Sequence, residues 1–331
     1  MEIIETIDAK NRVNKMKILV TPTSMQPGKN EKMLDLLRGF SEDLVFNPFG
    51  KPLTEDELIP LLRDCDGFLA GLDFITEKVL DECPHLKVIS RYGAGYDRVD
   101  IEAAKKRGII VTNTPGVNSQ AVAELTFGLI ISLARKIPSL DASTKSGGWV
   151  RNVGMELNEK TLGILGLGAI GKILAKCGQG FGMNVIAYDP YIDLSYCEEN
   201  HIKSCLFEEL TTASDVISLH MPLNDETYHI IGRDAFEKMK DGVIVVNTSR
   251  GGIIDEDAAI EALKSGKLGG LGLDAFEEEP PKDTNLFGFD NVITTPHTGA
   301  HTKEAIDNMA LNSIKNLIDV LSGKDCSFVV L

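Results

Sequence analysis

The chain has 331 residues, of which 43% are hydrophobic; this exceeds the size of one hydrophobic core, so two domains are expected. A formal net charge of −15, from 49 acidic and 34 basic residues, argues against nucleic acid and anionic membrane as partners. The six cysteines include no Cys-x-x-Cys pair, and no segment approaches the ~18 apolar residues of a membrane span. The charged first 15 residues lack the apolar run of a signal peptide. We therefore expect a cytoplasmic protein with reduced thiols and a short N-terminal extension.

Short β-branched segments alternate with helical segments almost from end to end, which predicts parallel sheets covered by helices. In the first third of the chain the predicted strands are 17–21, 44–46, 67–70, 87–90 and 109–112. The predicted helices between them are 31–39, 55–63 and 100–106. These segments together predict a first α/β unit.

A long helical pattern follows this unit. Apolar residues recur at helical spacing from Ser119 to about Lys145, which predicts one continuous helix. The strands predicted after it are 161–165, 184–188, 215–219, 243–247, 268–273 and 292–294. An amphipathic helix is predicted over 302–321. The pattern thus indicates two consecutive α/β units joined by a long helix.

The strongest local motif is a glycine pattern at the first strand of the second unit. Residues 161–171 read TLGILGLGAIG, an apolar strand that runs into Gly-x-Gly-x-x-Gly and then into a helix. Gly166 permits the tight turn, Gly168 lets a pyrophosphate approach the backbone, and Gly171 lets helix and strand pack closely. The N-terminus of that helix, at Ala169 and Ile170, offers N–H donors to phosphate. The alternative is a purely structural turn.

Asp189 supports a dinucleotide at this turn. It ends the next predicted strand, 18 residues after Gly171, close to the ~20 at which an acid meets the ribose hydroxyls. An acid there repels a 2′-phosphate, and Pro190-Tyr191 supplies no arginine to replace it. We therefore predict NAD rather than NADP, the alternative being a solvated strand end.

Two later strand-end loops carry groups suited to hydride transfer, which needs a cation to polarise a ketone and an acid to protonate it. Arg250 follows the strand GVIVVN, and its planar fork suits a carboxylate. His297 follows the strand VITT and is a candidate general acid and base. Glu279, in DAFEEEPP, would fix the imidazole tautomer if it lay beside His297.

Each of these residues also has a structural interpretation. A single arginine in a loop is commonly a surface ion pair, and the acidic run Glu277 to Glu279 is typical of a solvated loop. His85 and His201 are assigned to the surface. His229 and His301 stay undecided between structural and functional roles. No metal is predicted.

Seven motifs in order resemble the D-isomer-specific 2-hydroxyacid dehydrogenases, especially their 3-phosphoglycerate dehydrogenase branch, over residues 17–318. They are RYGAGYDRVD (91–100), VTNTPGVNSQAVAELTFGLIISLAR (111–135), TLGILGLGAIG (161–171), SLHMPLNDET (218–227), VVNTSRGGIIDE (245–256), GLDAFEEEP (272–280) and TPHTGAHTKEA (295–305).

The resemblance implies a catalytic trio in which Arg250 holds the substrate carboxylate and keto oxygen, His297 donates the proton and Glu279 pairs the histidine. It implies that Asp274 holds the nicotinamide carboxamide. It implies backbone N–H groups at Ala94 and Gly95 as a nest for the substrate carboxylate. The further cofactor-lining residues that it implies are His220, Pro222, Thr248 and Ser249.

The resemblance also implies two Rossmann-like, doubly wound domains. A discontinuous, flavodoxin-like substrate domain (16–112 and 299–331) would flank an NAD-binding Rossmann domain (113–298). The long helix near 119–145 resembles the family's dimer contact, so a homodimer is expected. Because the sequence ends at Leu331, the regulatory domain of some phosphoglycerate dehydrogenases is expected to be absent.

The sequence leaves the substrate open among small D-2-hydroxy and 2-keto acids. A phosphate-bearing substrate such as 3-phosphoglycerate or 3-phosphohydroxypyruvate would need extra cations, for which Arg91, Arg98 and Arg151 are the candidates. A glyoxylate or hydroxypyruvate reductase is the alternative within the family, and an NAD-sensing scaffold or co-repressor is the alternative outside catalysis. Formate dehydrogenase is disfavoured, since an amide rather than Glu279 would suit formate.

Overall fold

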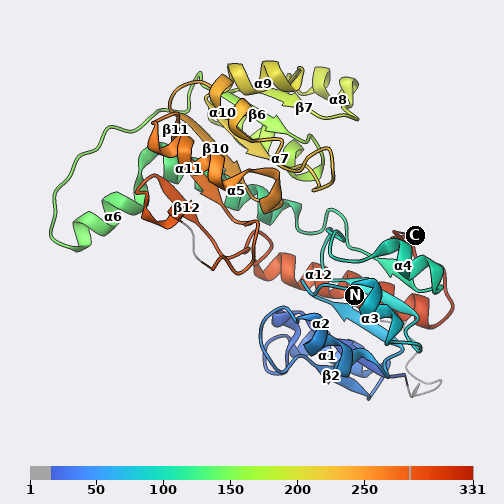
Figure 1. The fold of residues 1–331 in the computed structure, drawn as a ribbon. Helices are drawn as coiled ribbons and strands as arrows, with labels where there is room; N and C mark the ends of the chain where they lie inside the picture. The colour runs from blue at the N-terminus through green and yellow to red at the C-terminus, as the bar shows by residue number, and fades with distance from the viewer. Residues whose placement is uncertain (1–15, 283–284, 331) are drawn as a thin grey trace. The chain divides into compact units, whose positions relative to one another are not determined.

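The computed structural model describes residues 16–282 and 285–330, and it divides the chain into two compact units. Among the described residues, unit 1 comprises 16–118 and 302–330, and unit 2 comprises 119–282 and 285–301. Unit 1 is therefore formed by two separate segments of the chain. Our expected boundaries, 112/113 and 298/299, lie six and three residues before those of the structure. Figure 1 shows the elements of both units.

Unit 1 is a five-stranded parallel sheet with strand order β2-β1-β3-β4-β5, the flavodoxin-like order. Its strands are β1 (Ile18–Val20), β2 (Leu44–Phe46), β3 (Gly67–Ala70), β4 (Val88–Arg91) and β5 (Ile110–Thr112). Its helices are α1 (Glu31–Arg38), α2 (Glu55–Leu62), α3 (Glu77–Asp81), α4 (Ile101–Lys106) and α12 (Lys303–Leu321), with a 3-10 turn η1 (Thr23–Met25).

Helices cover both faces of this sheet. One hydrophobic cluster joins α1 and α12 to the sheet, and a second joins α2, α3 and α4 to the other face. The buried α12 residues Ile314 and Leu317 explain why the last helix belongs to the first unit. Near the C-terminus, Val329 forms an antiparallel bridge with Thr112 on edge strand β5.

Unit 2 is a seven-stranded parallel sheet with order β12-β11-β10-β9-β6-β7-β8. Its strands are β6 (Thr161–Leu165), β7 (Asn184–Tyr188), β8 (Lys203–Ser204), β9 (Val216–Leu219), β10 (Val243–Asn247), β11 (Leu268–Leu273) and β12 (Val292–Thr294). Its helices are α5 (Ser119–Arg135), α6 (Ile137–Lys145), α7 (Ala169–Gly180), α8 (Leu194–Glu199), α9 (Phe207–Ala213), α10 (Arg233–Lys238) and α11 (Glu256–Lys264), with 3-10 turns η2 (Gly251–Ile253) and η3 (Asn285–Gly288). Strand order reverses direction at β6 and β9, the point where such sheets bind ligands.

The prediction of one helix over 119–145 was wrong. The helix ends at Arg135, and Lys136 adopts a left-handed conformation with φ 54° before α6 begins at Ile137. Pro138 explains the break, because its ring would clash with the Ala134 carbonyl and it has no N–H to donate. That carbonyl instead accepts a hydrogen bond from the N–H of Met155 at 2.8 Å.

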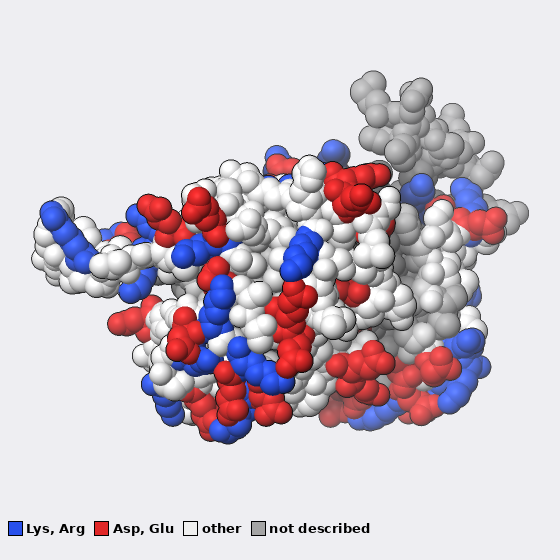
Figure 2. Space-filling model, turned by 90° about the horizontal axis from the view of Figure 1, so that it is seen from above, with Lys and Arg blue, Asp and Glu red and all other residues white. Residues whose placement is uncertain are grey.

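Charged side chains of both signs are mixed on the face shown in Figure 2, where Asp and Glu alternate with Lys and Arg. Elsewhere in the described structure, exposed ion pairs such as Arg38 with Asp35 and Lys145 with Asp141 join charges of opposite sign. Across the described residues, no helix is both long and apolar enough to span a membrane.

Candidate active site

The glycine turn follows β6 at the reversal of strand order. Gly166 has a φ of 97°, and a Cβ there would lie 2.8 Å from the backbone of His220. A Cβ on Gly171 would lie 2.3 Å from the Gly166 carbonyl oxygen. Both positions therefore require glycine, one for its backbone angle and one for helix packing. Gly168, by contrast, faces open space, since no heavy atom lies within 4 Å of its would-be Cβ.

These features fit a pyrophosphate. Gly168 is the N-cap of α7, and the first N–H groups of a helix have no acceptor inside the helix. The open space at Gly168 lies where those donors, including Ala169 and Ile170, begin the helix, which is the arrangement that receives phosphate.

Asp189 connects this turn to the end of β7. Its Oδ2 accepts a hydrogen bond from Leu167 N at 2.9 Å, and its Oδ1 accepts one from Tyr191 N at 2.8 Å. A carboxylate has about four acceptor positions, so lone pairs remain for ribose hydroxyls. The structure thus places the carboxylate beside the glycine turn, and it also gives Asp189 a role in shaping that turn that the sequence did not indicate.

His220 follows β9 on the opposite side of the same turn. Its Nε2 lies 2.9 Å from Ser218 Oγ, while its buried Nδ1 has no hydrogen-bond partner among the described residues. Burial lowers the pKa of His220 to about 3, so the imidazole is neutral at physiological pH. A buried polar atom without a partner is uncommon and fits a site where a polar ligand is held.

The other predicted cofactor-lining residues have partners within the protein. The Pro222 carbonyl accepts from Thr227 Oγ1 at 2.7 Å. Thr248 Oγ1 lies 2.8 Å from Thr126 Oγ1 of α5, and Ser249 N and Oγ both donate to Asn247 Oδ1. The hydroxyls of Thr248 and Ser249 therefore stabilise the loop that follows β10. Contact of Pro222, Thr248 and Ser249 with a cofactor stays a prediction.

Arg250 is positioned by Asn247, the fully buried last residue of β10. Asn247 Nδ2 donates to the Arg250 carbonyl at 2.7 Å, so one side chain closes the turn that carries the arginine. Arg250 Nη1 donates to the Ser249 carbonyl at 2.8 Å. Sequence reasoning overlooked Asn247; an amide at the end of a buried strand, directly before a polar turn, was the available signal.

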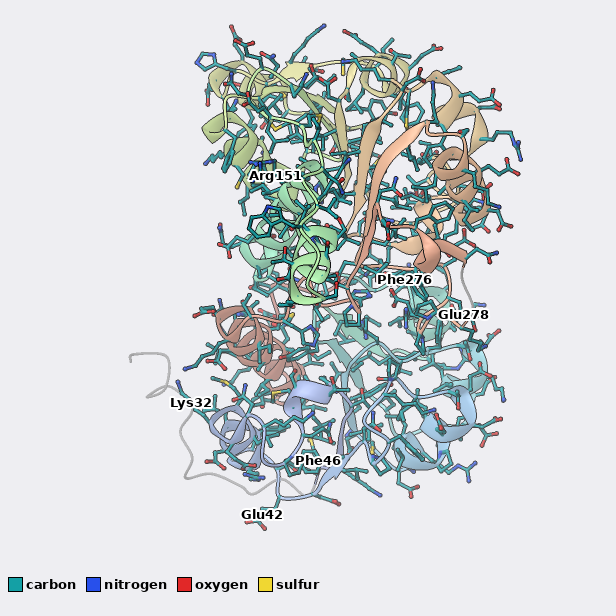
Figure 3. The ribbon with its side chains drawn as sticks, turned by 90° about the vertical axis from the view of Figure 1, so that its left-hand side faces the viewer. Lys32, Glu42, Phe46, Arg151, Phe276 and Glu278 are labelled. Carbon is teal, nitrogen blue, oxygen red and sulfur yellow. The ribbon has the colours of Figure 1, made fainter. Side chains whose placement is uncertain are left out.

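Gly251 brings the Arg250 loop against the loop that carries Glu279. A Cβ at Gly251 would lie 1.8 Å from the Phe276 carbonyl carbon, so only glycine permits this approach. Figure 3 shows Phe276 and Glu278 on the loop after β11. The two loops thus share a backbone contact that the sequence did not indicate.

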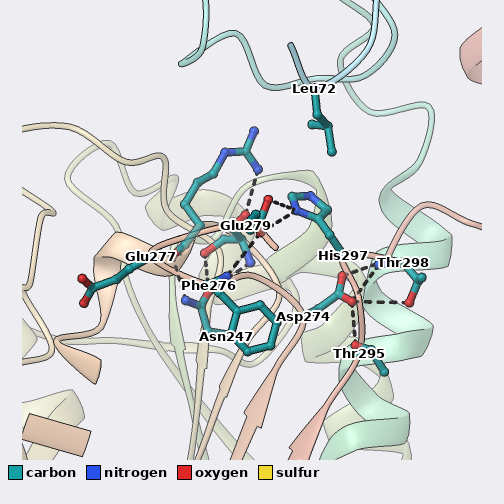
Figure 4. A network of polar contacts seen from close by, with 12 residues as sticks. Leu72, Asn247, Asp274, Phe276, Glu277, Glu279, Thr295, His297 and Thr298 are labelled. Carbon is teal, nitrogen blue, oxygen red and sulfur yellow. Dashed lines mark hydrogen bonds and ion pairs between the residues drawn. The ribbon is translucent and has the colours of Figure 1, made fainter. Parts of the chain in front are cut away.

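Glu279 and His297 form a direct pair. His297 Nδ1 lies 2.8 Å from Glu279 Oε1 and 3.0 Å from Oε2, as Figure 4 shows. The Glu279 side chain is 13% exposed and that of His297 28%, so the pair is largely shielded from solvent. Glu279 Oε1 also accepts from Phe276 N at 3.3 Å. His297 has a φ of 51°, a backbone conformation that is uncommon for a residue with a side chain and is found at functional sites.

Asp274 holds the His297 loop. Its carboxylate, 1% exposed, accepts hydrogen bonds from Thr298 N at 2.8 Å, Gly299 N at 2.7 Å and Thr295 Oγ1 at 2.6 Å (Figure 4). These bonds bracket His297 on both sides. The resemblance suggested only a cofactor contact for Asp274, whereas the structure shows it supporting the loop that carries His297.

Ala94 and Gly95 lie in unit 1, after β4. Asn113 Nδ2 donates to the Ala94 carbonyl at 2.8 Å, and Arg91 Nε donates to the Gly95 carbonyl at 3.1 Å. Arg91 is only 2% exposed, which disfavours it as a phosphate ligand. Arg98 Nη1 donates to the Leu72 carbonyl at 2.8 Å, and Arg151 is exposed in unit 2.

Comparison with known proteins identifies the family of this chain. Residues 127–299 match the family model described as the NAD binding domain of D-isomer specific 2-hydroxyacid dehydrogenases. The chain belongs to this family. It is 41% identical over 319 residues to a glyoxylate reductase of Thermococcus litoralis, covering 93% of this chain and 95% of that protein.

Other family members resemble the chain over different lengths. It is 48% identical over 257 residues to a D-3-phosphoglycerate dehydrogenase of Methanocaldococcus jannaschii, covering 76% of this chain but 49% of that protein. The chain thus spans about half the length of that relative. The crystal structure of a D-lactate dehydrogenase from Aquifex aeolicus, complexed with NAD and lactic acid, superimposes with a TM-score of 0.84 at 31% identity, covering 95% and 99% of the two chains.

Proposed function

We propose that this family member is an NAD-dependent oxidoreductase that interconverts a small D-2-hydroxy acid and its 2-keto acid. The observation that carries the proposal is the His297–Glu279 pair, with Nδ1 bonded to the carboxylate at 2.8 Å. Glu279 fixes the ring so that Nε2 is the nitrogen that exchanges a proton with substrate oxygen. Nicotinamide, when bound, supplies or accepts the hydride at the substrate carbon.

Arg250 and the Ala94–Gly95 loop would bind the acid itself. The Arg250 guanidinium would polarise the keto oxygen and hold a carboxylate. Backbone N–H groups at Ala94 and Gly95 are proposed as donors to a substrate carboxylate. In reduction, His297 donates its proton to the oxygen as the keto group becomes an alcohol. In oxidation it takes that proton back.

Unit 2 would bind the cofactor and unit 1 the substrate. Gly166, Gly168 and Gly171 shape the phosphate turn, Asp189 accepts from the ribose hydroxyls, and Asp274 combines loop support with a nicotinamide contact. His220 Nδ1, buried and without a described partner, would gain one from the cofactor. An acid at 189 disfavours the 2′-phosphate of NADP.

A homodimer is the proposed assembly, and the protein is proposed to be cytoplasmic. In Figure 1, α6 and the chain after it extend away from the sheet of unit 2. None of the α6 residues is buried, and Trp149, Val150 and Val153 are 78%, 53% and 86% exposed. Apolar side chains on a projecting segment are typical of an interface. Analytical ultracentrifugation tests this: a monomer at micromolar concentration would refute it.

The decisive experiment measures NADH oxidation by purified protein with glyoxylate, hydroxypyruvate, pyruvate, branched 2-keto acids and 3-phosphohydroxypyruvate. We expect turnover with at least one of them and a preference for NADH over NADPH. The buried Arg91 favours the unphosphorylated acids of the glyoxylate and hydroxypyruvate type over 3-phosphohydroxypyruvate. Cofactor binding without turnover on any acid would refute the enzyme and favour an NAD-sensing scaffold.

A further inference from the structure

A second histidine–carboxylate pair lies outside the catalytic trio. His229 Nε2 is 2.9 Å from Glu277 Oε1, and Glu277 belongs to the same turn as Glu279. We infer that His229 is a positioning residue that joins the Arg250 loop to the Glu279 turn and so orients Glu279 toward His297. This inference rests on the proposed function, because it assigns a purpose to His229 in the same reaction.

The backbone of His229 is bonded to the Arg250 loop. Its N–H donates to the Gly252 carbonyl at 2.8 Å, two residues after Arg250. A parallel bridge between Ile231 and Ile254 extends this contact. His229 has a φ of 52°, a left-handed conformation that its surroundings must impose. The histidine is therefore anchored to one catalytic loop independently of its ring.

The ring of His229 is bonded to the other loop. Glu277 Oε1, which the imidazole contacts, also accepts from Glu256 N at 3.1 Å, and Glu277 N donates to Glu256 Oε1 at 2.9 Å. Tyr228 stacks on the imidazole at 3.9 Å between ring centroids, with 15° between the planes. The side chains of His229 and Glu277 are 29% and 35% exposed, so the pair is partly shielded from water.

The turn that His229 holds leads directly to Glu279. Phe276 N donates to Glu279 Oε1 at 3.3 Å, and the Phe276–Glu277 peptide packs against Gly251. Removing the imidazole leaves in place the two hydrogen bonds that the backbone N–H groups of Glu256 and Glu277 donate to each other's carboxylates. We therefore expect the fold to survive while the orientation of Glu279 relaxes.

The first test compares His229→Ala with His229→Gln. Alanine removes the bond to Glu277, and we expect kcat for the keto acid to fall about tenfold because the general acid is less well oriented. Glutamine keeps an N–H donor and should recover most of that loss. The KM for NADH should be unchanged in both variants. Equal losses in the two variants, or a loss confined to KM for NADH, would overturn the assignment.

Arg233→Ala is the matched control. Arg233 pairs with Glu261 at 2.6 Å, linking α10 to α11 in the same region, but both side chains are exposed and neither contacts the catalytic loops in the described structure. This variant should retain wild-type kcat. If it lost as much activity as His229→Ala, the effect would reflect general loosening of the region.

A double-mutant cycle with Glu279→Gln tests the route of action. If His229 acts through Glu279, His229→Ala should have little further effect on kcat once Glu279 is replaced. Fully additive losses would refute the inference.

A spectroscopic measurement separates this inference from the proposed function. In 15N-histidine-labelled protein, the Nδ1 shift of His297 reports its bond to Glu279, and the four histidines other than His229 and His297 serve as internal references. We expect His229→Ala to move this signal in the direction that Glu279→Gln does, with or without turnover in the wild type. An unmoved signal would overturn the positioning role, whereas absent turnover alone would refute only the proposed reaction.

Discussion

The two sheets of this protein share an architecture but differ at the loops that follow their strands. In unit 1, the buried Asp73 accepts from Leu53 N at 2.8 Å and from Thr21 Oγ1, and Arg91 donates to backbone carbonyls. Asp73 and Arg91 thus form hydrogen bonds with backbone atoms of unit 1. In unit 2, the corresponding loops bring a carboxylate and an imidazole together as Glu279 and His297.

This difference shows that a doubly wound sheet places loops where ligands can bind, whereas the side chains on those loops determine which reaction is possible. Both units end parallel strands in polar loops, and in unit 2 these loops pair the imidazole of His297 with the carboxylate of Glu279. The two buried aspartates, Asp73 and Asp274, are each 1% exposed and bonded by N–H and hydroxyl donors. Asp274 supports the loop that carries His297, the proposed proton donor.

The largest effect is expected from Arg250→Ala. Loss of the guanidinium removes the charge that stabilises the developing oxyanion, so kcat/KM should fall about a thousandfold. The Kd for NADH, measured by fluorescence, should be nearly unchanged because Arg250 is assigned to the substrate. A collapse of NADH binding would show that the arginine serves the cofactor instead.

Asp274→Asn and Asp73→Asn compare the two units directly. Each change replaces an acceptor oxygen by a donor beside buried donors, and each should lower the free energy of unfolding by about 1–3 kcal/mol. Only Asp274→Asn should also lower kcat, by about tenfold or more, because it loosens the His297 loop. Urea unfolding and steady-state kinetics measure both quantities. An equal kcat loss in Asp73→Asn would break the comparison.

Asp189→Ala is expected to change cofactor choice more than rate. Without the carboxylate, the ribose loses an acceptor and a 2′-phosphate is no longer repelled, so the NADH over NADPH preference should narrow about tenfold. Asp193→Ala, at the exposed N-cap of α8, is the control and should leave the ratio unchanged. If Asp189→Ala and Asp193→Ala showed the same NADH over NADPH preference, the assignment of Asp189 to the ribose would be wrong.

The smallest effect at neutral pH concerns His220. Burial lowers its folded-state pKa to about 3, so below the ordinary value of 6.5 the unfolded chain binds a proton that the folded chain does not. Stability should therefore fall as pH drops from about 6.5 toward 3, with this residue contributing up to about 1.4 kcal/mol per pH unit.

His220→Asn should remove that contribution from urea unfolding curves measured between pH 7 and pH 5. His201→Asn, at an exposed histidine, should leave the slope unchanged. If both variants kept the wild-type slope, His220 would not be the neutral, buried group that the structure shows.

The sequence by itself determined the fold class, the alternation of strands and helices and the glycine turn, because these depend on local periodicity and on backbone angles that glycine adopts. It also nominated Arg250, Glu279 and His297, since each lies in a loop that follows a strand, where ligands of such sheets bind. Pro138 was the sequence signal for the helix break at Lys136, but the helical spacing of apolar residues across this region led to the prediction of one helix.

Only the tertiary structure decided which side chains meet. Glu279 and His297 are 18 residues apart and lie 2.8 Å from each other because β11 and β12 are parallel neighbours whose ends share one edge of the sheet. The supporting contacts of Asp274, Asn247 and His229 depend in the same way on loops brought together by strand order. Spacing along a chain carries no information about such contacts, because long-range packing rather than local preference creates them.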